Sequence, residues 1–294
     1  MLTKDTAICI RAVDYSETSQ IVTLFTRQAG KISAIAKGSK RPKSAFDGPI
    51  EVFSHGKIVF SDSNREKLAT LTEFEQQTGF SNLASNLFAL NCCFFAAELV
   101  DKLTNDYDPH PELFDSFLRF LQNTNEVRAS LVRHSASEGG SDEHNRHSER
   151  STAESRNLSL TDPSAALGVT ARTGNERRDT LSLLILFQLS LLKEIGLQPI
   201  LNACVNCKTQ YTIRNTQYDI YFSSSANGLI CRDCESSFPD KIRLTNSAAN
   251  CLANVKLIAK SQEKALNEIE KILIYHFTEI LGRPPKMAKY ILKD

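Results

Sequence analysis

The sequence predicts an α+β protein with more than one domain, in which a small N-terminal β-barrel precedes an α-helical domain with an embedded four-cysteine module. Three observations support this fold class. Apolar and polar residues alternate with a period of two up to about residue 76, and the period then becomes helical. Two Cys-x-x-Cys pairs interrupt the helical part, and 294 residues suffice for two domains with sizeable cores.

The N-terminal part contains five short β-prone runs. Turn-like segments rich in Gly, Pro, Asp and Asn separate them, as in "DYSET" and "GSKRPKSAFDGP". Five strands in about 70 residues are typical of an OB-fold, although an SH3-like barrel fits the same pattern. We therefore assign residues 1–78 to a small β-barrel of one of these two types.

Residues 79–294 are predicted to form the helical domain. Ser81 is a plausible N-cap for the first helix, and Pro111 suits the first turn of the second. The third is expected to begin at Asp179 and is apolar on nearly all sides, which indicates a buried helix. The expected helices cover residues 81–103, 111–122, 179–196, 245–259 and 262–281.

A polar segment, residues 130–178, separates the second and third expected helices. It is rich in Ser, Arg, Glu and Gly and has almost no aromatic or β-branched clusters. Such a composition buries too little apolar surface to offset the entropy of ordering, so we expect a disordered insertion. Its three histidines are interpreted as solvated, in preference to a metal-binding tract.

Whole-chain composition is that of an ordinary soluble protein, with 41% apolar and 23% charged residues and a formal net charge of +1. The N-terminus lacks a secretory signal, and no apolar run reaches the length of a membrane helix. We expect a cytoplasmic protein with no membrane partner. In a reducing cytosol, paired cysteines indicate metal or redox chemistry.

The four-cysteine module spans residues 202–238. Each pair has two intervening residues, and 23 residues separate the pairs, which are Cys204 with Cys207 and Cys231 with Cys234. Two such turns present four thiolates to one Zn²⁺, and four sulfur ligands leave no position for water or substrate. The sequence therefore predicts structural zinc, with Asn227-Gly228 turning an inserted hairpin into the second pair.

Two other interpretations of these cysteines remain open. Thioredoxin-like redox chemistry needs a strand-to-helix turn that the sequence does not provide, and four unligated core thiols are the simplest alternative. The other cysteines, at positions 9, 92, 93 and 251, are interpreted as small buried hydrophobic residues.

A basic loop is expected after the third strand. Residues 31–43 carry five positive charges and no acidic residue. A cationic loop on a small barrel can follow a phosphate backbone, although a solvated surface loop has the same composition. Phe46 is the one aromatic residue near it, which favours backbone contact over base reading. The candidate nucleic-acid-binding residues are Lys37, Lys40, Arg41, Lys43 and Arg11.

Two further cationic features have weaker functional interpretations. Arg27 could extend the path of the basic loop. Four positively charged residues lie near the C-terminus. They could form a second binding strip, or they could reflect the usual enrichment of positive charge at a helix C-terminus. These are Arg283, Lys286, Lys289 and Lys293.

No catalytic constellation is visible, so we predict a binding protein and not an enzyme. His55, His110 and His276 stand in unrelated contexts, and phosphate-binding glycine motifs are absent. Acidic pairs at helical spacing, such as Glu268 with Glu270, are interpreted as solvated faces.

The order of these features resembles the RecO family of bacterial DNA repair and recombination proteins along nearly the whole chain except the insertion. The stretch "DYSETSQIVTLFTRQAGKISAIAKGSKRPKS" is similar to that family's first hairpin and basic loop, and the end reads "YHFTEILGRPPKMAKYI". Many but not all members share the cysteine quartet. The insertion departs from the family pattern, and its role is unassigned.

The resemblance implies an OB-fold that binds single- and double-stranded DNA and anneals complementary strands. It implies that the protein acts with RecR and RecF in the RecF pathway. It also implies contact with the acidic tail of single-stranded-DNA-binding protein, and help in loading RecA at gaps. Arg283 and Lys286 are candidates for the tail by charge alone. One alternative is a zinc-stabilised adaptor that binds only proteins, and another is a zinc-dependent hydrolase or oxidoreductase.

Overall fold

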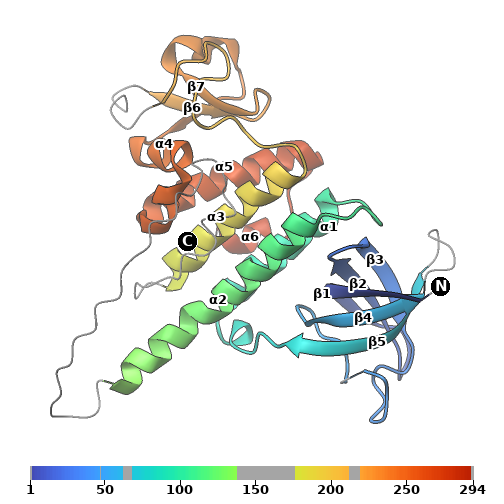
Figure 1. Cartoon of the computed structure of the whole chain (residues 1–294). Helices are drawn as coiled ribbons and strands as arrows, with labels where there is room; N and C mark the ends of the chain where they lie inside the picture. The colour runs from blue at the N-terminus through green and yellow to red at the C-terminus, as the bar shows by residue number, and fades with distance from the viewer. Residues whose placement is uncertain (1, 47, 62–67, 138–175, 212–218, 293–294) are drawn as a thin grey trace, which may run out of the picture.

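The computed structural model describes residues 2–46, 48–61, 68–137, 176–211 and 219–292. A β-barrel, a layer of helices and a small three-stranded sheet follow one another across the molecule (Figure 1). None of the helices in these ranges combines the length and apolarity needed to cross a bilayer.

The barrel contains five strands, as predicted. They pair in the order β1-β2-β3-β5-β4, and β4 also pairs with β1, so the ring of strands closes. The β3–β5 seam is parallel and joins only three residue pairs, which gives the barrel its OB-like character. The strands are β1 (Leu2–Asp14), β2 (Gln20–Thr26), β3 (Gly30–Ala36), β4 (His55–Ser61) and β5 (Ala69–Thr78).

Alternation along β1 and β2 gives the barrel two apolar faces. Cys9 and Leu24 point into the barrel core, whereas Ile8 and Phe25 are buried against the helices. The Phe25 ring lies 5.9 Å from the ring of Phe114 on α2 (Pro111–Ser137). Burial of both faces attaches the barrel firmly to the helical part.

The helical part is centred on α3 (Glu176–Glu194), which every neighbouring helix contacts. Its residues from Asp179 to Leu192 are all buried, as its apolar circumference predicts. Around it lie α1 (Leu87–Leu103), α2 and α5 (Glu263–Leu281).

The observed helices differ from the predicted ones at several boundaries, and the expected helix over residues 245–259 is divided into α4 (Asn246–Ala253) and the 3₁₀ helix η4 (Val255–Lys260). The first helix begins at Leu87, capped by the Asn86 side chain, because the residues after Ser81 form the short turn η1 (Leu83–Ser85). The second is longer than predicted and ends at Ser137, and the third begins at Glu176. The predicted insertion therefore overlaps both helices, and its residues 138–175 lie outside the described part of the chain.

The cysteine module contributes two strands to a three-stranded sheet in the order β7-β6-β8, and the third strand lies beyond the predicted end of the module at residue 238. The predicted hairpin is present: β6 (Ile220–Ser223) and β7 (Gly228–Cys231) are antiparallel, and Asn227 has a left-handed φ of 52° in the turn before Gly228. Residues 212–218 lie outside the described part. The remaining elements are η3 (Arg232–Ser237), β8 (Ile242–Leu244), α4 (Asn246–Ala253), η4 (Val255–Lys260) and α6 (Ala288–Ile291).

The interpretation of Glu268 and Glu270 as a solvated face is wrong for Glu270, whereas Glu268 is partly exposed. Glu270 is fully buried, and its Oε1 accepts a 2.8 Å hydrogen bond from the side-chain amide of Gln188 on α3. Glu268 accepts hydrogen bonds from the backbone N–H and hydroxyl of Thr245, which precedes α4. Both carboxyl groups thus join segments that are distant in the sequence.

Candidate nucleic-acid interface and metal site

The basic loop leaves the barrel at an edge where three strand ends meet. In the strand register, Asp14 at the end of β1 lies opposite Gln20, and Gln20 lies opposite Ala36 at the end of β3. Lys37 follows directly, and the next strand, β4, begins at His55. The loop therefore extends from one end of the barrel.

A buried glutamine holds this loop. The Oε1 of Gln20 accepts a hydrogen bond from the Ser39 hydroxyl at 3.0 Å and another from the Ile50 N–H at 2.9 Å. Its Nε2 donates to the Ile50 carbonyl at 3.2 Å. Because Gln20 is only 5% exposed, these bonds are shielded from water and fix both arms of the loop.

The loop is also tied to the turn between β1 and β2. The Lys40 N–H donates to the Thr18 carbonyl at 3.2 Å, and the Gly38 N–H donates to the Ser19 hydroxyl at 3.3 Å. Gly38 has φ 75°, which permits the tight bend after Lys37. The loop and the turn therefore form one connected surface.

The predicted basic residues differ in their exposure and in whether they form ion pairs. Lys37, Arg41 and Lys43 are exposed, and no ion pair joins them to an acidic group of the described residues. Lys40 is half-buried and pairs with Asp14 at 2.7 Å, which neutralises part of its charge. Arg11 is exposed on β1, beside a register shift in the β1–β2 ladder.

Two other cations of the barrel serve the contact with the helices. The Lys31 ammonium is nearly buried and donates to the carbonyls of Asp101 and Thr104 at 2.6 and 2.9 Å, at the end of α1. Arg27 makes a two-pronged ion pair with Asp115 of α2, and this hydrogen bonding lowers the pKa of the Asp115 carboxyl. Arg27 therefore does not extend the path of the basic loop.

The aromatic residue near the loop is Tyr15 and not Phe46. Phe46 is 7% exposed and packs in the barrel core, beside Phe74. The Tyr15 side chain is 64% exposed in the β1–β2 turn, where its N–H donates to the Ser19 carbonyl. A large aromatic residue in the polar turn "DYSET" was the sequence signal for this position.

The four cysteines of the two pairs converge. Their sulfur atoms all lie within 4.8 Å of one another, and those of Cys207 and Cys231 are 3.6 Å apart. A tetrahedral ion with bonds of about 2.3 Å requires sulfur–sulfur distances of roughly 3.8 Å, so the donor set fits a metal ion. The structure thus confirms the predicted four-cysteine cluster.

Local hydrogen bonds hold the cysteine sulfur atoms in position around the cluster. Cys204 closes a turn by accepting from the Lys208 N–H at 3.0 Å, and Lys208 has a left-handed φ of 62°. The Cys204 sulfur accepts from the Cys231 N–H, and the Cys234 sulfur accepts from the Asn206 side chain. N–H groups directed at sulfur favour the thiolate form, which binds metal.

The thiols differ in acidity. The hydrogen bond from Thr209 lowers the pKa of Cys207 to about 6, whereas burial raises the pKa of Cys231 to about 12. A divalent cation would bind all four as thiolates and release the remaining protons. Cys9, Cys92, Cys93 and Cys251 are buried, in agreement with their predicted packing role.

The C-terminal cationic strip is exposed at Arg283, Lys286 and Lys289, and Lys293 lies outside the described part of the chain. The chain here is fixed by Glu98, whose carboxylate accepts from the N–H groups of Lys286 and Met287, both at 2.8 Å. The cationic side chains themselves make no ion pair with the described acidic residues.

Known proteins resemble this chain along nearly its whole length. The domain described as "Recombination protein O N terminal" matches residues 1–80, and "Recombination protein O C terminal" matches residues 84–134 and 173–289. The DNA repair protein RecO of Bacillus subtilis is 28% identical over 302 residues, covering 99% of this chain and 94% of that protein. The DNA repair protein RecO of Salinibacter ruber is 37% identical over 125 residues, covering 42% of this chain and 48% of that protein.

Proposed function

The chain belongs to the recombination protein O (RecO) family, and from this premise we propose that it is a DNA repair and recombination mediator that grips DNA through its basic loop. The projecting loop with three unpaired cations is the observation that supports the proposal most directly. Each cation that meets a phosphate releases a counterion, so binding is expected to be independent of sequence and sensitive to salt.

The proposed interface consists of Lys37, Arg41 and Lys43, with Arg11 beside them and Lys40 in a secondary role. The ion pair with Asp14 reduces the attraction of Lys40 for phosphate and instead fixes the loop to β1. The bonds of Gln20 keep the loop in place without DNA, which lowers the entropy lost on binding.

Such an interface suits strand annealing. Backbone contacts leave the base edges free to pair with a second strand. We further propose that Tyr15 stacks on one base of a single strand, because an exposed ring stands in the turn that adjoins the loop. Neither process requires a nucleophile, in keeping with a binding protein and not an enzyme.

Membership in the family supports proposals about partners. We propose that the chain acts in the RecF pathway with RecR and RecF, binds the tail of single-stranded-DNA-binding protein, and helps to load RecA. The exposed cations Arg283 and Lys286 have the charge to attract an acidic tail.

We propose that the ion at the cysteine cluster is Zn²⁺ and that it is structural. Thiolates at tetrahedral spacing favour zinc, which when bound supplies four strong cross-links between the β7 end and the turn at Cys204. The four sulfurs complete the coordination sphere, so they leave no position for a reacting water.

A triple variant tests the DNA interface. Replacing Lys37, Arg41 and Lys43 with glutamine should weaken binding to labelled oligonucleotide by about 100-fold at moderate salt. It should also reduce the slope of log K against log salt by about 2, since each single-strand phosphate contact contributes roughly 0.7. Fluorescence anisotropy across a salt series gives both quantities.

The matched control removes the same charge elsewhere, at the exposed Lys4, Lys264 and Lys271. It should keep the wild-type slope. If both triple variants bind equally well, the loop is not the interface. If the wild-type protein fails to bind DNA at low salt, the adaptor interpretation replaces the proposal.

A further inference from the structure

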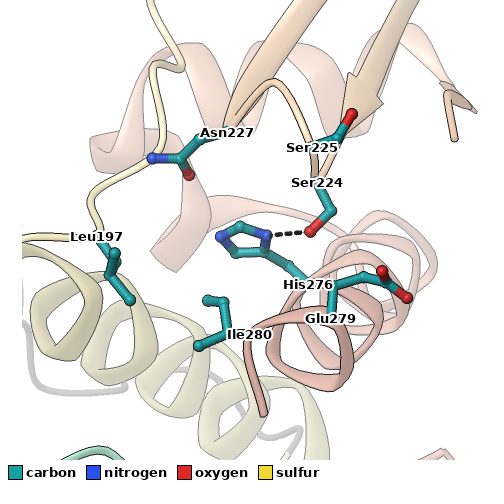
Figure 2. Close-up of a pocket in the computed structure, with 7 residues that line it drawn as sticks. All are labelled: Leu197, Ser224, Ser225, Asn227, His276, Glu279 and Ile280. Atoms are coloured by element: carbon teal, nitrogen blue, oxygen red, sulfur yellow. Dashed lines mark hydrogen bonds between the residues drawn. The ribbon is translucent and has the colours of Figure 1, made fainter. Parts of the chain in front are cut away.

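A pocket in the helical half lies far along the chain from the basic loop. It has a volume of about 360 Å³ and opens between the β6–β7 turn and the C-terminal half of α5 (Figure 2). Leu197 and Ile280 form an apolar wall, and Ser224, Asn227 and His276 supply polar atoms. None of the residues that line it is a cysteine or belongs to the barrel, so the proposed DNA and metal sites do not account for it.

The imidazole of His276 is buried but incompletely bonded. Its side chain is 3% exposed, and its Nδ1 lies 2.7 Å from the Ser224 hydroxyl oxygen. Its edge packs against Phe222, with ring centroids 5.4 Å apart. Among the described residues, its Nε2 has no hydrogen-bond partner. A buried polar atom without a hydrogen bond destabilises the fold, so a ligand that pairs with it gains affinity.

Asn227 offers a second unpartnered atom to the same pocket. Its Nδ2 donates to the Gln198 carbonyl at 3.3 Å, which fixes the orientation of the amide and directs Oδ1 into the pocket. This Oδ1 is buried and has no partner among the described residues. Because Oδ1 can only accept, the missing group must be a donor.

The charge of the pocket favours a cation as that donor. Burial lowers the pKa of His276 to about 4, so the ring is neutral at physiological pH. Glu279 is then the one charged group among the described residues that line the pocket, and it stands exposed at the mouth. The apolar wall suits a methylene chain, and Leu197 is 39% exposed without a partner to cover it.

We propose that this pocket binds the arginine side chain of a partner protein. This proposal assigns to His276 the tautomer in which Nδ1–H donates to the Ser224 hydroxyl, so that Nε2 presents a lone pair on the side of the ring that faces Asn227 Oδ1. A planar guanidinium has five donors in a fixed fork and reaches both acceptors at once, whereas an ammonium is a point donor. Its methylenes lie on Leu197 and Ile280, and Glu279 adds electrostatic attraction. The proposal does not depend on the DNA-binding function.

The experiment compares two probes on the full chain. N-acetyl-arginine methylamide and its neutral isostere, N-acetyl-citrulline methylamide, are titrated while the ¹⁵N resonances of the His276 ring are followed by NMR. The arginine probe should move Nε2 and keep the Nδ1–H tautomer, and the citrulline probe should bind about tenfold more weakly. The equivalent lysine probe should also bind more weakly than arginine.

Two variants locate the acceptors. Asn227→Gly removes Oδ1 while glycine tolerates the φ of 52°, and it should weaken the arginine probe about tenfold. Glu279→Gln should weaken it about threefold, as for an exposed charge. Glu73→Gln removes an exposed charge from the barrel and should change nothing. Thermal melting checks that each variant is folded.

Three outcomes would overturn the proposal. Equal affinity for both probes, or for a carboxylate probe such as N-acetylglycine, would show that the pocket does not select a cation. Full affinity in Asn227→Gly and Glu279→Gln would place binding elsewhere. If the ¹⁵N resonance of His276 Nε2 does not change at a saturating concentration of the arginine probe, the guanidinium does not bond to Nε2.

Discussion

The two halves of the molecule place their reactive groups in opposite ways. In the barrel, the cations of the basic loop and Tyr15 point outward, and the apolar residues fill the interior. In the helical half, Glu270, His276 and two of the clustered cysteines are buried, whereas Cys207 is exposed and Cys231 is half-buried. Exposed charges can contact a second molecule, whereas the buried polar groups form hydrogen bonds within the chain. Under the proposals above, the barrel binds DNA through its exposed loop, while Glu270 and the four-cysteine cluster act on the stability of the helical half.

The largest expected difference between the barrel and the helical half follows from loss of the metal site. Cys234→Ser should abolish metal binding and lower the melting temperature by roughly 10–20 °C, because the module loses a cross-link worth about 5 kcal/mol. Elemental analysis and calorimetry measure both. DNA affinity of the folded variant should stay within about twofold of wild type.

Cys251→Ser is the matched control, since Cys251 is buried outside the cluster and hydrogen-bonds to Ser261. It should retain the metal. If Cys234→Ser loses DNA binding while still folded, the four-cysteine cluster contributes to DNA binding and not to stability alone.

A smaller effect concerns Glu270 in the helical interior. Burial raises the pKa of its carboxyl to about 8 from an ordinary 4.5, so the group is protonated in the folded protein at pH 7. The unfolded chain loses this proton above about pH 4.5 and the folded chain does not. The contribution of this group to stability is therefore greatest below pH 4.5 and declines up to about pH 8.

Glu270→Gln should remove this decline and stabilise the protein at pH 7 by about 2–3 kcal/mol, with little change at pH 4.5. Urea unfolding at both pH values measures the difference. A variant that is less stable at pH 7 would indicate that the carboxyl is ionised and paired in the fold.

The smallest effect tests Tyr15 on the outer surface of the barrel. Tyr15→Ala should weaken single-stranded DNA binding by about 1–3 kcal/mol and leave duplex binding unchanged, because only unpaired bases can stack on the ring. Anisotropy with matched oligonucleotides measures both affinities. Tyr15→Phe keeps the ring and should bind like wild type, and equal losses on single and double strands would exclude stacking.

The sequence by itself determined the features whose causes are local. Period-two alternation gave the five barrel strands, and the change to helical spacing gave the helices around α3. The two Cys-x-x-Cys turns converge because each pair is formed within one turn and the hairpin has few ways to bring them together. The positive charge of the loop was also visible, since no acidic residue interrupts it.

Only the tertiary structure decided which polar groups form hydrogen bonds within the protein. Lys31 bonds to Thr104, 73 residues away, and Gln20 bonds to Ile50, 30 residues away. Phe46 and Glu270 looked exposed in the local sequence but are buried by segments packed over them. Propensity and periodicity act over a few residues, whereas burial and pairing depend on partners brought together by folding. For that reason the pocket around His276 had no sequence signature.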